Sequence, residues 1–199
     1  MFYSNNLKKL KKIKHCFFSK RNGFSKGIYK SLNCGKGSND SKIDVDKNLS
    51  FVAKKMGVKK NKLILMHQTH SNKVVEVKRN NYKKKIKADA MVTKMKGISL
   101  GVLTADCVPI ILYDVNNEII GCIHAGWKGA YKDIISKVIN FLIKKGSHPR
   151  NITAAIGPAI SVKNYEVQQD FKKKFIKKDK KNLMFFKINK KKLYFDLTS

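Results

Sequence analysis

Residues 97–127 contain no lysine, although about one residue in five of this 199-residue chain is lysine. Elsewhere lysine gathers in solvated runs such as NYKKKIK (81–87) and DFKKKFIKKDKKN (170–182). Because lysine is almost never fully buried without a partner, a long segment that excludes it is expected to be buried or to line a binding site. The stretch GVLTADCVPIILYDVNNEIIGCIHAGW, from Gly101 to Trp127, is therefore where we expect buried strands or a functional site.

This stretch has the pattern of a β-hairpin. Two apolar runs flank VNNE (115–118), and asparagine tolerates the positive φ angles that a two-residue turn at the asparagines requires. With that turn, Pro109 lies opposite His124, and Cys107 becomes a diagonal neighbour of His124 on the same face, with Cα atoms about 7–8 Å apart. A thiolate and an imidazole so placed can share a metal ion or act as a nucleophile and its base. The alternative is a buried cysteine that merely packs near a core histidine.

The rest of the chain alternates between strand and helix patterns, which predicts a mixed α/β (α+β) fold with a mixed β-sheet flanked by helices. No repeat or linker interrupts residues 1–199, which are interpreted as one domain. Helices are predicted over 45–56, ended by Gly57, over 131–145, ended by Gly146, and over 167–178. Strands are predicted over 61–77 (two, around a polar turn), 98–114 (one long buried strand), 116–126, 151–160 and 183–197 (a terminal hairpin).

Composition argues against several classes of protein. No apolar run reaches the roughly 18 residues of a membrane span, and the N-terminus lacks the apolar core of a signal peptide, so we expect a cytoplasmic protein without a membrane partner. The four cysteines form no CxxC pair and are expected to be thiols or ligands. The net charge of +31 suggests nucleic-acid binding, but only three of the 44 basic residues are arginine, the residue favoured for base recognition. We therefore interpret the charge as a solvated surface, with no specific nucleic-acid partner.

Several blocks of the sequence resemble a known family. They are SKRNGFSKGIYKSLNCG (19–35), QTHSNKVVEV (68–77), ADAMVT (88–93), GVLTADCVPIILYD (101–114), GCIHAGWKG (121–129) and GPAISVKNYEV (157–167). In this order they are similar to the YfiH family, also known as laccase-domain or multicopper polyphenol oxidase-like proteins, and the resemblance runs from about residue 15 to 197. The TADC and HAGW elements are its most specific part.

The resemblance implies one metal site. Its ligands carry over as His70, Cys107 and His124, and the metal is usually assigned as zinc (Zn²⁺), with copper (Cu²⁺) also proposed. The sequence by itself does not choose between His67 and His70, which lie near the same strand end. Three protein ligands leave a fourth position open, as in catalytic zinc sites.

The resemblance also implies purine nucleoside phosphorylase activity. The substrates would be adenosine, inosine, guanosine or methylthioadenosine plus phosphate, and the products a free base and ribose 1-phosphate or its methylthio analogue. Adenosine deaminase activity is a second implied reaction, in which a metal-bound hydroxide attacks the base. With His70, Cys107 and His124 as the catalytic centre, the predicted substrate-binding residues are Lys20, where the family usually has arginine, Asn33, Asp89, Trp127 and Lys128.

Other functions stay open at this point. A copper-dependent polyphenol oxidase needs several copper centres, and the chain has only five histidines. A cysteine hydrolase using Cys107 and His124, or a non-catalytic zinc-binding protein, fits the same pair of residues. Members of the family usually continue past FDL (195–197), so we expect this chain to lack their usual C-terminal segment. The oligomeric state is expected to be a monomer or homodimer.

Overall fold

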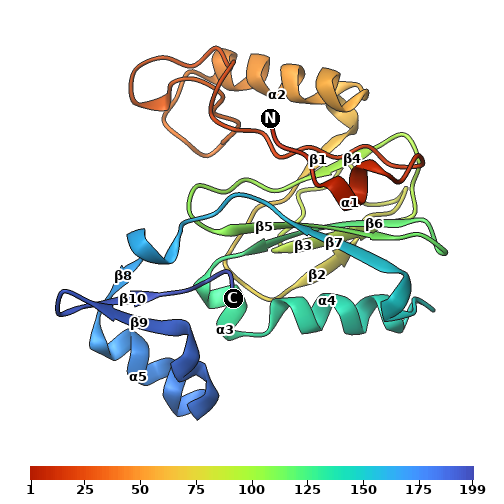
Figure 1. The fold of residues 1–199 in the computed structure, drawn as a ribbon. Helices are drawn as coiled ribbons and strands as arrows, with labels where there is room; N and C mark the ends of the chain where they lie inside the picture. The colour runs from red at the N-terminus through yellow and green to blue at the C-terminus, as the bar shows by residue number, and fades with distance from the viewer.

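The computed structural model describes all 199 residues, and its central element is a five-stranded sheet (Figure 1). The strand order is β2 (Val74–Glu76), β3 (Ala90–Thr93), β6 (Ile119–Ala125), β5 (Val108–Asp114) and β7 (Ile152–Ile156). The pair β2–β3 is parallel and the other three pairs are antiparallel. The predicted mixed sheet is therefore confirmed, and the lysine-free hairpin supplies two of its three inner strands.

The hairpin has the predicted register but a different turn. Pro109 pairs with His124, while the ladder ends at the pair Asp114 and Ile119, which leaves a four-residue turn. The positive φ angle falls on Glu118, at 52°, and not on the asparagines. Asp114 explains the wider turn, because its buried carboxylate accepts hydrogen bonds from the first two amides that follow Val115, both at 3.0 Å. A two-residue turn and a four-residue turn with the same centre give the same cross-strand pairs. The predicted register is therefore confirmed.

The prediction of one long strand over 98–114 is wrong. The chain forms β4 (Ser99–Gly101), leaves the sheet over residues 102–107, and enters β5 only at Val108. Strand β4 pairs in parallel with β1 (Leu63–Leu65) in a separate two-stranded sheet. Apolar composition reports burial and does not report which sheet a segment joins. The two strands expected within 61–77 are present as β1 and β2, in different sheets.

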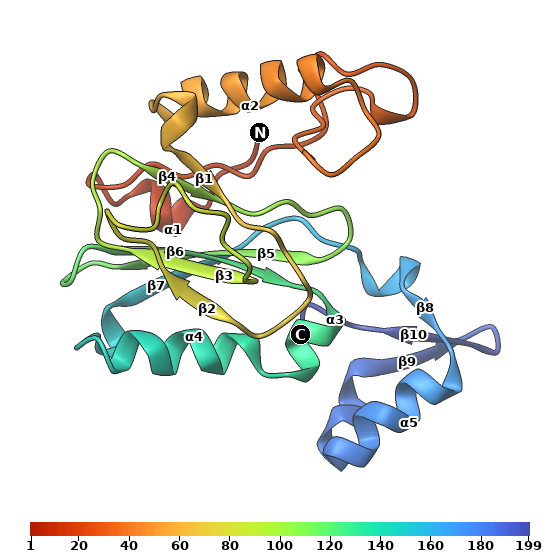
Figure 2. The same ribbon diagram turned by 180° about the vertical axis from the view of Figure 1, so that it is seen from behind.

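Helices and the small sheet cover the two faces of the five-stranded sheet (Figures 1 and 2). On one face α4 (Ile134–Ile143) packs Ile134, Val138 and Leu142 against β3, β5 and β6, beside the short α3 (Trp127–Tyr131). On the other face lie α1 (Asn5–Lys8), the β1–β4 sheet and α2 (Lys42–Met56). Helix α2 ends at Gly57 with φ 77°, which confirms that predicted helix and its C-terminal cap.

The C-terminal residues form a small lobe beside the main body (Figure 1). Helix α5 (Gln169–Lys178) packs on a three-stranded sheet of β8 (Glu166–Val167), β10 (Lys192–Phe195) and β9 (Phe186–Asn189). The last two strands are antiparallel and confirm the predicted terminal hairpin. Short 3₁₀ turns occupy Gly27–Tyr29, Lys60–Lys62, Pro149–Asn151, Val162–Asn164 and Lys180–Phe185. None of the helices has the length and apolar character needed to cross a membrane.

We predict that Asp114→Ala destabilises the fold by about 1–3 kcal/mol, because it removes the buried carboxylate that accepts hydrogen bonds from two amides of the hairpin turn. Urea denaturation followed by circular dichroism measures this change. Asp170→Ala is the matched control, since the side chain of Asp170 is 95% exposed, and it should alter the free energy of unfolding by less than about 0.5 kcal/mol. Equal stabilities of the two variants would contradict the role given to Asp114.

Candidate metal centre

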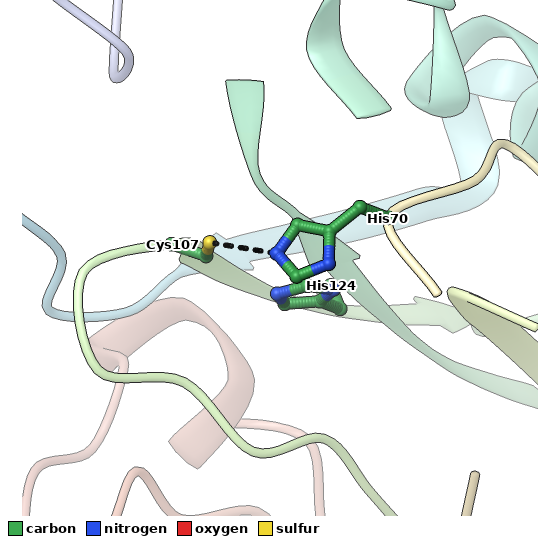
Figure 3. A group of neighbouring side chains, drawn as sticks. All are labelled: His70, Cys107 and His124. Atoms are coloured by element: carbon green, nitrogen blue, oxygen red, sulfur yellow. Dashed lines mark hydrogen bonds between the residues drawn. The ribbon is translucent and has the colours of Figure 1, made fainter. Parts of the chain in front are cut away.

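Three side chains from separate segments converge at one end of the hairpin (Figure 3). His70 lies in the loop between β1 and β2, Cys107 immediately precedes β5, and His124 belongs to β6. Their ligand atoms all lie within 4.8 Å of one another, and Cys107 Sγ is 4.0 Å from His70 Nε2. The two imidazole rings meet edge to face, with centroids 4.8 Å apart. The structure thus brings together the three residues predicted as ligands.

Asp89 lies directly behind this cluster and holds two of its members. Its carboxylate is 0% exposed and accepts hydrogen bonds from the backbone amides of Thr69, His70 and Ser71. It also accepts from the Ser71 hydroxyl at 2.6 Å and from His124 Nδ1 at 2.9 Å. The tight loop this requires puts His70 in the left-handed region, at φ 54°. One buried carboxylate therefore fixes both histidines.

The protonation of the pair Asp89 and His124 follows from these contacts. Burial alone raises the pKa of Asp89, but hydrogen bonds from Ser71, His124 and the loop amides outweigh burial and lower the pKa to about 2. Burial lowers the pKa of His124, against the attraction of Asp89. The histidine is therefore neutral near pH 7, with its proton on Nδ1 facing the carboxylate. Its Nε2 lone pair is left free for a metal ion, the arrangement in which a carboxylate orients a ligating histidine.

Gly126 provides the space in which the cluster sits. A Cβ atom at this position would lie 2.8 Å from Cys107 Sγ and 3.0 Å from His70 Cδ2. Both distances are shorter than a carbon atom tolerates without displacement of the ligand. The glycine two residues after His124 is thus a steric requirement of the site.

The donor set fits a zinc or copper ion. Zinc is bound by cysteine sulfur and histidine nitrogen, and a set of two histidines and one cysteine also suits copper. A tetrahedral zinc ion holds such donors roughly 3.3–3.6 Å apart, so the observed separations need only small side-chain rotations. His70 is exposed and Cys107 half-buried, which leaves one side of the cluster open to a cavity. This open side is where a substrate or water can approach.

A second interaction joins the loops that carry His70 and Cys107. The side-chain amide of Gln68 donates to the carbonyl of Leu103 at 2.7 Å, and its oxygen accepts from the Leu103 amide at 2.8 Å. The pair imitates one rung of a β-ladder between two segments that have no strand pairing there. Gln68 could not be identified from the sequence, because its hydrogen-bond partner is the backbone of Leu103, 35 residues away.

The predicted substrate-binding residues divide into two groups. Lys20 and Asn33 line the cavity beside the metal ligands. The Asn33 amide is committed to its own loop, donating to Ser38 Oγ and Asp40 Oδ2, both at 2.9 Å. Lys20 has an exposed side chain and is one of five lysines that line the cavity.

The other three predicted contacts lie outside that cavity. Asp89 has no exposed surface and contacts the ligand loop instead. Trp127 turns away from the ligands and packs on Phe171 of α5, with ring centroids 5.1 Å apart. Lys128 Nζ lies 5.6 Å from the centroid of the Trp127 ring. In this structure these three side chains organise or flank the centre and do not line it.

The environment of Cys107 argues against a simple cysteine nucleophile. Burial raises the pKa of its thiol, and the nearby carboxylates of Asp106 and Asp89 raise it further. Nucleophilic cysteines instead have a lowered pKa that favours the thiolate. The cysteine hydrolase interpretation is therefore not supported by the surroundings of the thiol.

The fold and the cluster define a mixed α/β protein with one candidate metal centre at the end of a β-hairpin. The chain belongs to the multi-copper polyphenol oxidoreductase laccase family, whose sequence model matches residues 14–199. The YfiH-type resemblance of the sequence blocks is thereby confirmed. The crystal structure of the YfiH protein of Bacillus licheniformis superposes with a TM-score of 0.82 at 29% identity, covering 89% of this chain and 71% of that chain.

Two curated relatives carry a functional name. A Rickettsia conorii protein named purine nucleoside phosphorylase RC0672 is 38% identical over 124 residues, which cover 62% of this chain and 50% of that protein. A Deinococcus radiodurans protein named purine nucleoside phosphorylase is 32% identical over 163 residues, covering 82% of this chain and 63% of that protein. The chain thus spans between half and two thirds of the length of these relatives.

We predict that Gly126→Ala lowers metal affinity at least tenfold while the fold is retained, because its Cβ displaces Cys107 and His70. Titration with zinc against a chromophoric chelator measures the affinity, and circular dichroism checks the fold. Gly129→Ala is the matched control, since its Cβ would meet no atom closer than 3.5 Å and alanine suits its helical position. Equal zinc affinities in the two variants would show that a side chain at position 126 does not displace the ligands.

Proposed function

We propose that this chain forms the metal-binding core of a purine nucleoside phosphorylase. The observation that carries the proposal is the His70, Cys107 and His124 cluster, oriented by a buried carboxylate and open on one side to a cavity. The names of the Rickettsia conorii and Deinococcus radiodurans relatives support the substrate class, a purine nucleoside with phosphate. The products would be a free purine base and ribose 1-phosphate, or the methylthio analogue from methylthioadenosine.

The residues on the cavity wall suggest a division of roles. His70, Cys107 and His124 would hold the ion, which when bound supplies a Lewis acid that polarises a substrate atom or acidifies a water molecule. Asp89 keeps the Nδ1 proton of His124 in place, so that the other ring nitrogen stays a donor. Lys20 attracts the phosphate co-substrate into the cavity. Zinc is the metal we propose, because three nitrogen and sulfur ligands that leave a fourth position open are the arrangement of a catalytic zinc site.

Adenosine deamination and polyphenol oxidation are two other activities that a metal centre of this kind suggests. Adenosine deamination needs only one activated water and fits a single metal site. Polyphenol oxidation by several copper ions has less support, because the structure contains one cluster of metal-binding side chains. Of the remaining histidines, His15 is buried and accepts a hydrogen bond from the Ser4 amide. His148 accepts one from the Arg150 amide.

We predict phosphate-dependent release of hypoxanthine from inosine and of adenine from adenosine by zinc-loaded protein, measured by liquid chromatography. Cys107→Ala and His124→Ala should lose at least 100-fold in rate together with their zinc. His67→Ala is the matched control, because His67 is exposed and does not line the cavity, and its activity should be unchanged.

The same chromatograms separate the alternatives. Inosine formed from adenosine without phosphate would demonstrate deamination. Absence of any phosphate-dependent base release from metal-loaded protein would sink the phosphorylase proposal. Oxidation of a phenolic substrate by copper-loaded protein, lost in Cys107→Ala, would favour the oxidase instead.

We predict that Lys20→Ala raises the KM for phosphate about tenfold, with little change in the KM for inosine or in zinc content. Lys20→Arg should lower the KM for phosphate, since guanidinium binds phosphate through two hydrogen bonds. Lys128→Ala is the comparison, because Lys128 lies outside the cavity lining, and it should leave the KM for phosphate unchanged. If Lys128→Ala raised the KM for phosphate more than Lys20→Ala did, phosphate binding would be assigned to Lys128 instead of Lys20.

A further inference from the structure

The cavity at the metal centre continues well beyond it as a slot between α2 and the five-stranded sheet. Its volume of about 1370 Å³ exceeds the roughly 300–1,000 Å³ of small-molecule sites. Leu49, Val52 and Met56 of α2 line one side of it, and Ile111 and Ile120 of the hairpin line the other. A nucleoside at the metal centre would leave most of this apolar slot unfilled.

Two segments form the remaining walls, and each contributes every residue in turn. Residues 94–107, which include β4, all line the slot, and so do residues 12–20. A strand alternates its side chains between two faces, so a wall of consecutive residues presents the edge of its backbone. Strand β1 behaves differently, because only the alternate residues Leu63 and Leu65 line the slot.

The backbone groups on both walls are short of hydrogen-bond partners. Strand β4 pairs only with β1, and residues 102–105 make no backbone–backbone hydrogen bond. Of these four residues only Leu103 has its backbone groups occupied, by the side chain of Gln68. On the opposite wall Phe17 pairs with Phe2, but residues 14–16 and 18–19 make no such bond. Free edges of this kind are templates for pairing with a further strand.

We propose that the slot is an acceptor site for an extended, apolar polypeptide segment, which hydrogen-bonds to residues 97–105 on one side and 14–19 on the other. Its alternate side chains would contact α2 and the hairpin, as in strand addition to an open sheet edge. This inference is independent of the reaction at the metal centre.

The longer relatives indicate where such a segment comes from. The region shared with this chain covers 71% of the solved YfiH chain and 50% of the Rickettsia conorii relative. More than a quarter of the YfiH chain therefore lies outside the match. Charge is a second criterion for identifying the segment. The lysines that line the slot outnumber the carboxylates and favour a segment with acidic flanks. The charged lining residues are Lys12, Lys14, Lys20, Lys94, Lys96, Asp106 and Glu118.

The test uses the full 199-residue chain and synthetic peptides of about 12 residues that tile the unmatched part of Bacillus licheniformis YfiH. Binding is measured by fluorescence anisotropy, and hydrogen–deuterium exchange locates the bound peptide. We expect at least one apolar peptide to bind and to slow amide exchange tenfold or more in residues 97–105 and 14–19. The same peptide with proline at alternate positions should bind at least tenfold more weakly, because proline cannot donate to the walls.

Matched variants on α2 connect binding to the slot. Val52→Lys places a charge on the slot side of the helix and should weaken binding at least tenfold. Ile43→Lys makes the same kind of change at a side of the helix that is 69% exposed, and it should bind as the unmodified chain does. Met56→Lys replaces Val52→Lys if circular dichroism shows that the latter fails to fold.

Three results would overturn the proposal: no peptide binds, the bound peptide protects other amides, or Val52→Lys and Ile43→Lys bind equally well. Concentration-dependent dimers whose walls are protected without peptide would assign the slot to a second copy of this chain. Displacement of an apolar dye by fatty acids, with no protection of the walls, would assign it to a small apolar ligand.

Discussion

The geometry of the candidate metal centre depends on the buried carboxylate of Asp89. A charge without solvent contact is costly unless it is fully hydrogen-bonded, and here three consecutive amides and a histidine supply the bonds. To present those amides, the loop must turn back at His70, which accepts a positive φ angle. The bonds that satisfy the charge therefore also set the directions of His70 and His124. The placement of the candidate ligands here follows from the burial of one acid immediately before β3.

The sequence predicted the hairpin register and the proximity of Cys107 to His124 because both depend on local symmetry about one turn. The turn type was wrong, since the preference of the Asp114 carboxylate for the following amides outweighed the preference of asparagine for positive φ. The two-sheet path of residues 98–114 was not predictable from apolar composition. Where the chain leaves one sheet for another depends on what the rest of the fold places there, including the Gln68 amide that replaces a strand partner at Leu103.

Nonlocal contacts also explain which site residues could not be assigned from the residues alone. His67 and His70 are equivalent by spacing, and the choice between them is made by Asp89, which is 19 residues beyond His70. The family resemblance indicated His70, but it did not show that Asp89 is the physical reason. Trp127 follows the predicted ligand His124 by three residues, yet α3 begins there and carries the indole toward α5. A residue close in sequence to a predicted ligand therefore need not line the site when a helix begins between the two.

The absence of lysine over residues 97–127 has two physical causes rather than one. Strands β5 and β6 exclude lysine because their side chains are mostly buried between two layers. Residues 104–106 are exposed, however, and in this chain exposed positions usually accept lysine. What distinguishes them is that they line the cavity beside the metal ligands, with free backbone groups at Thr104 and Ala105. A lysine there would project its long charged side chain into the space that a substrate or an inserted strand must occupy.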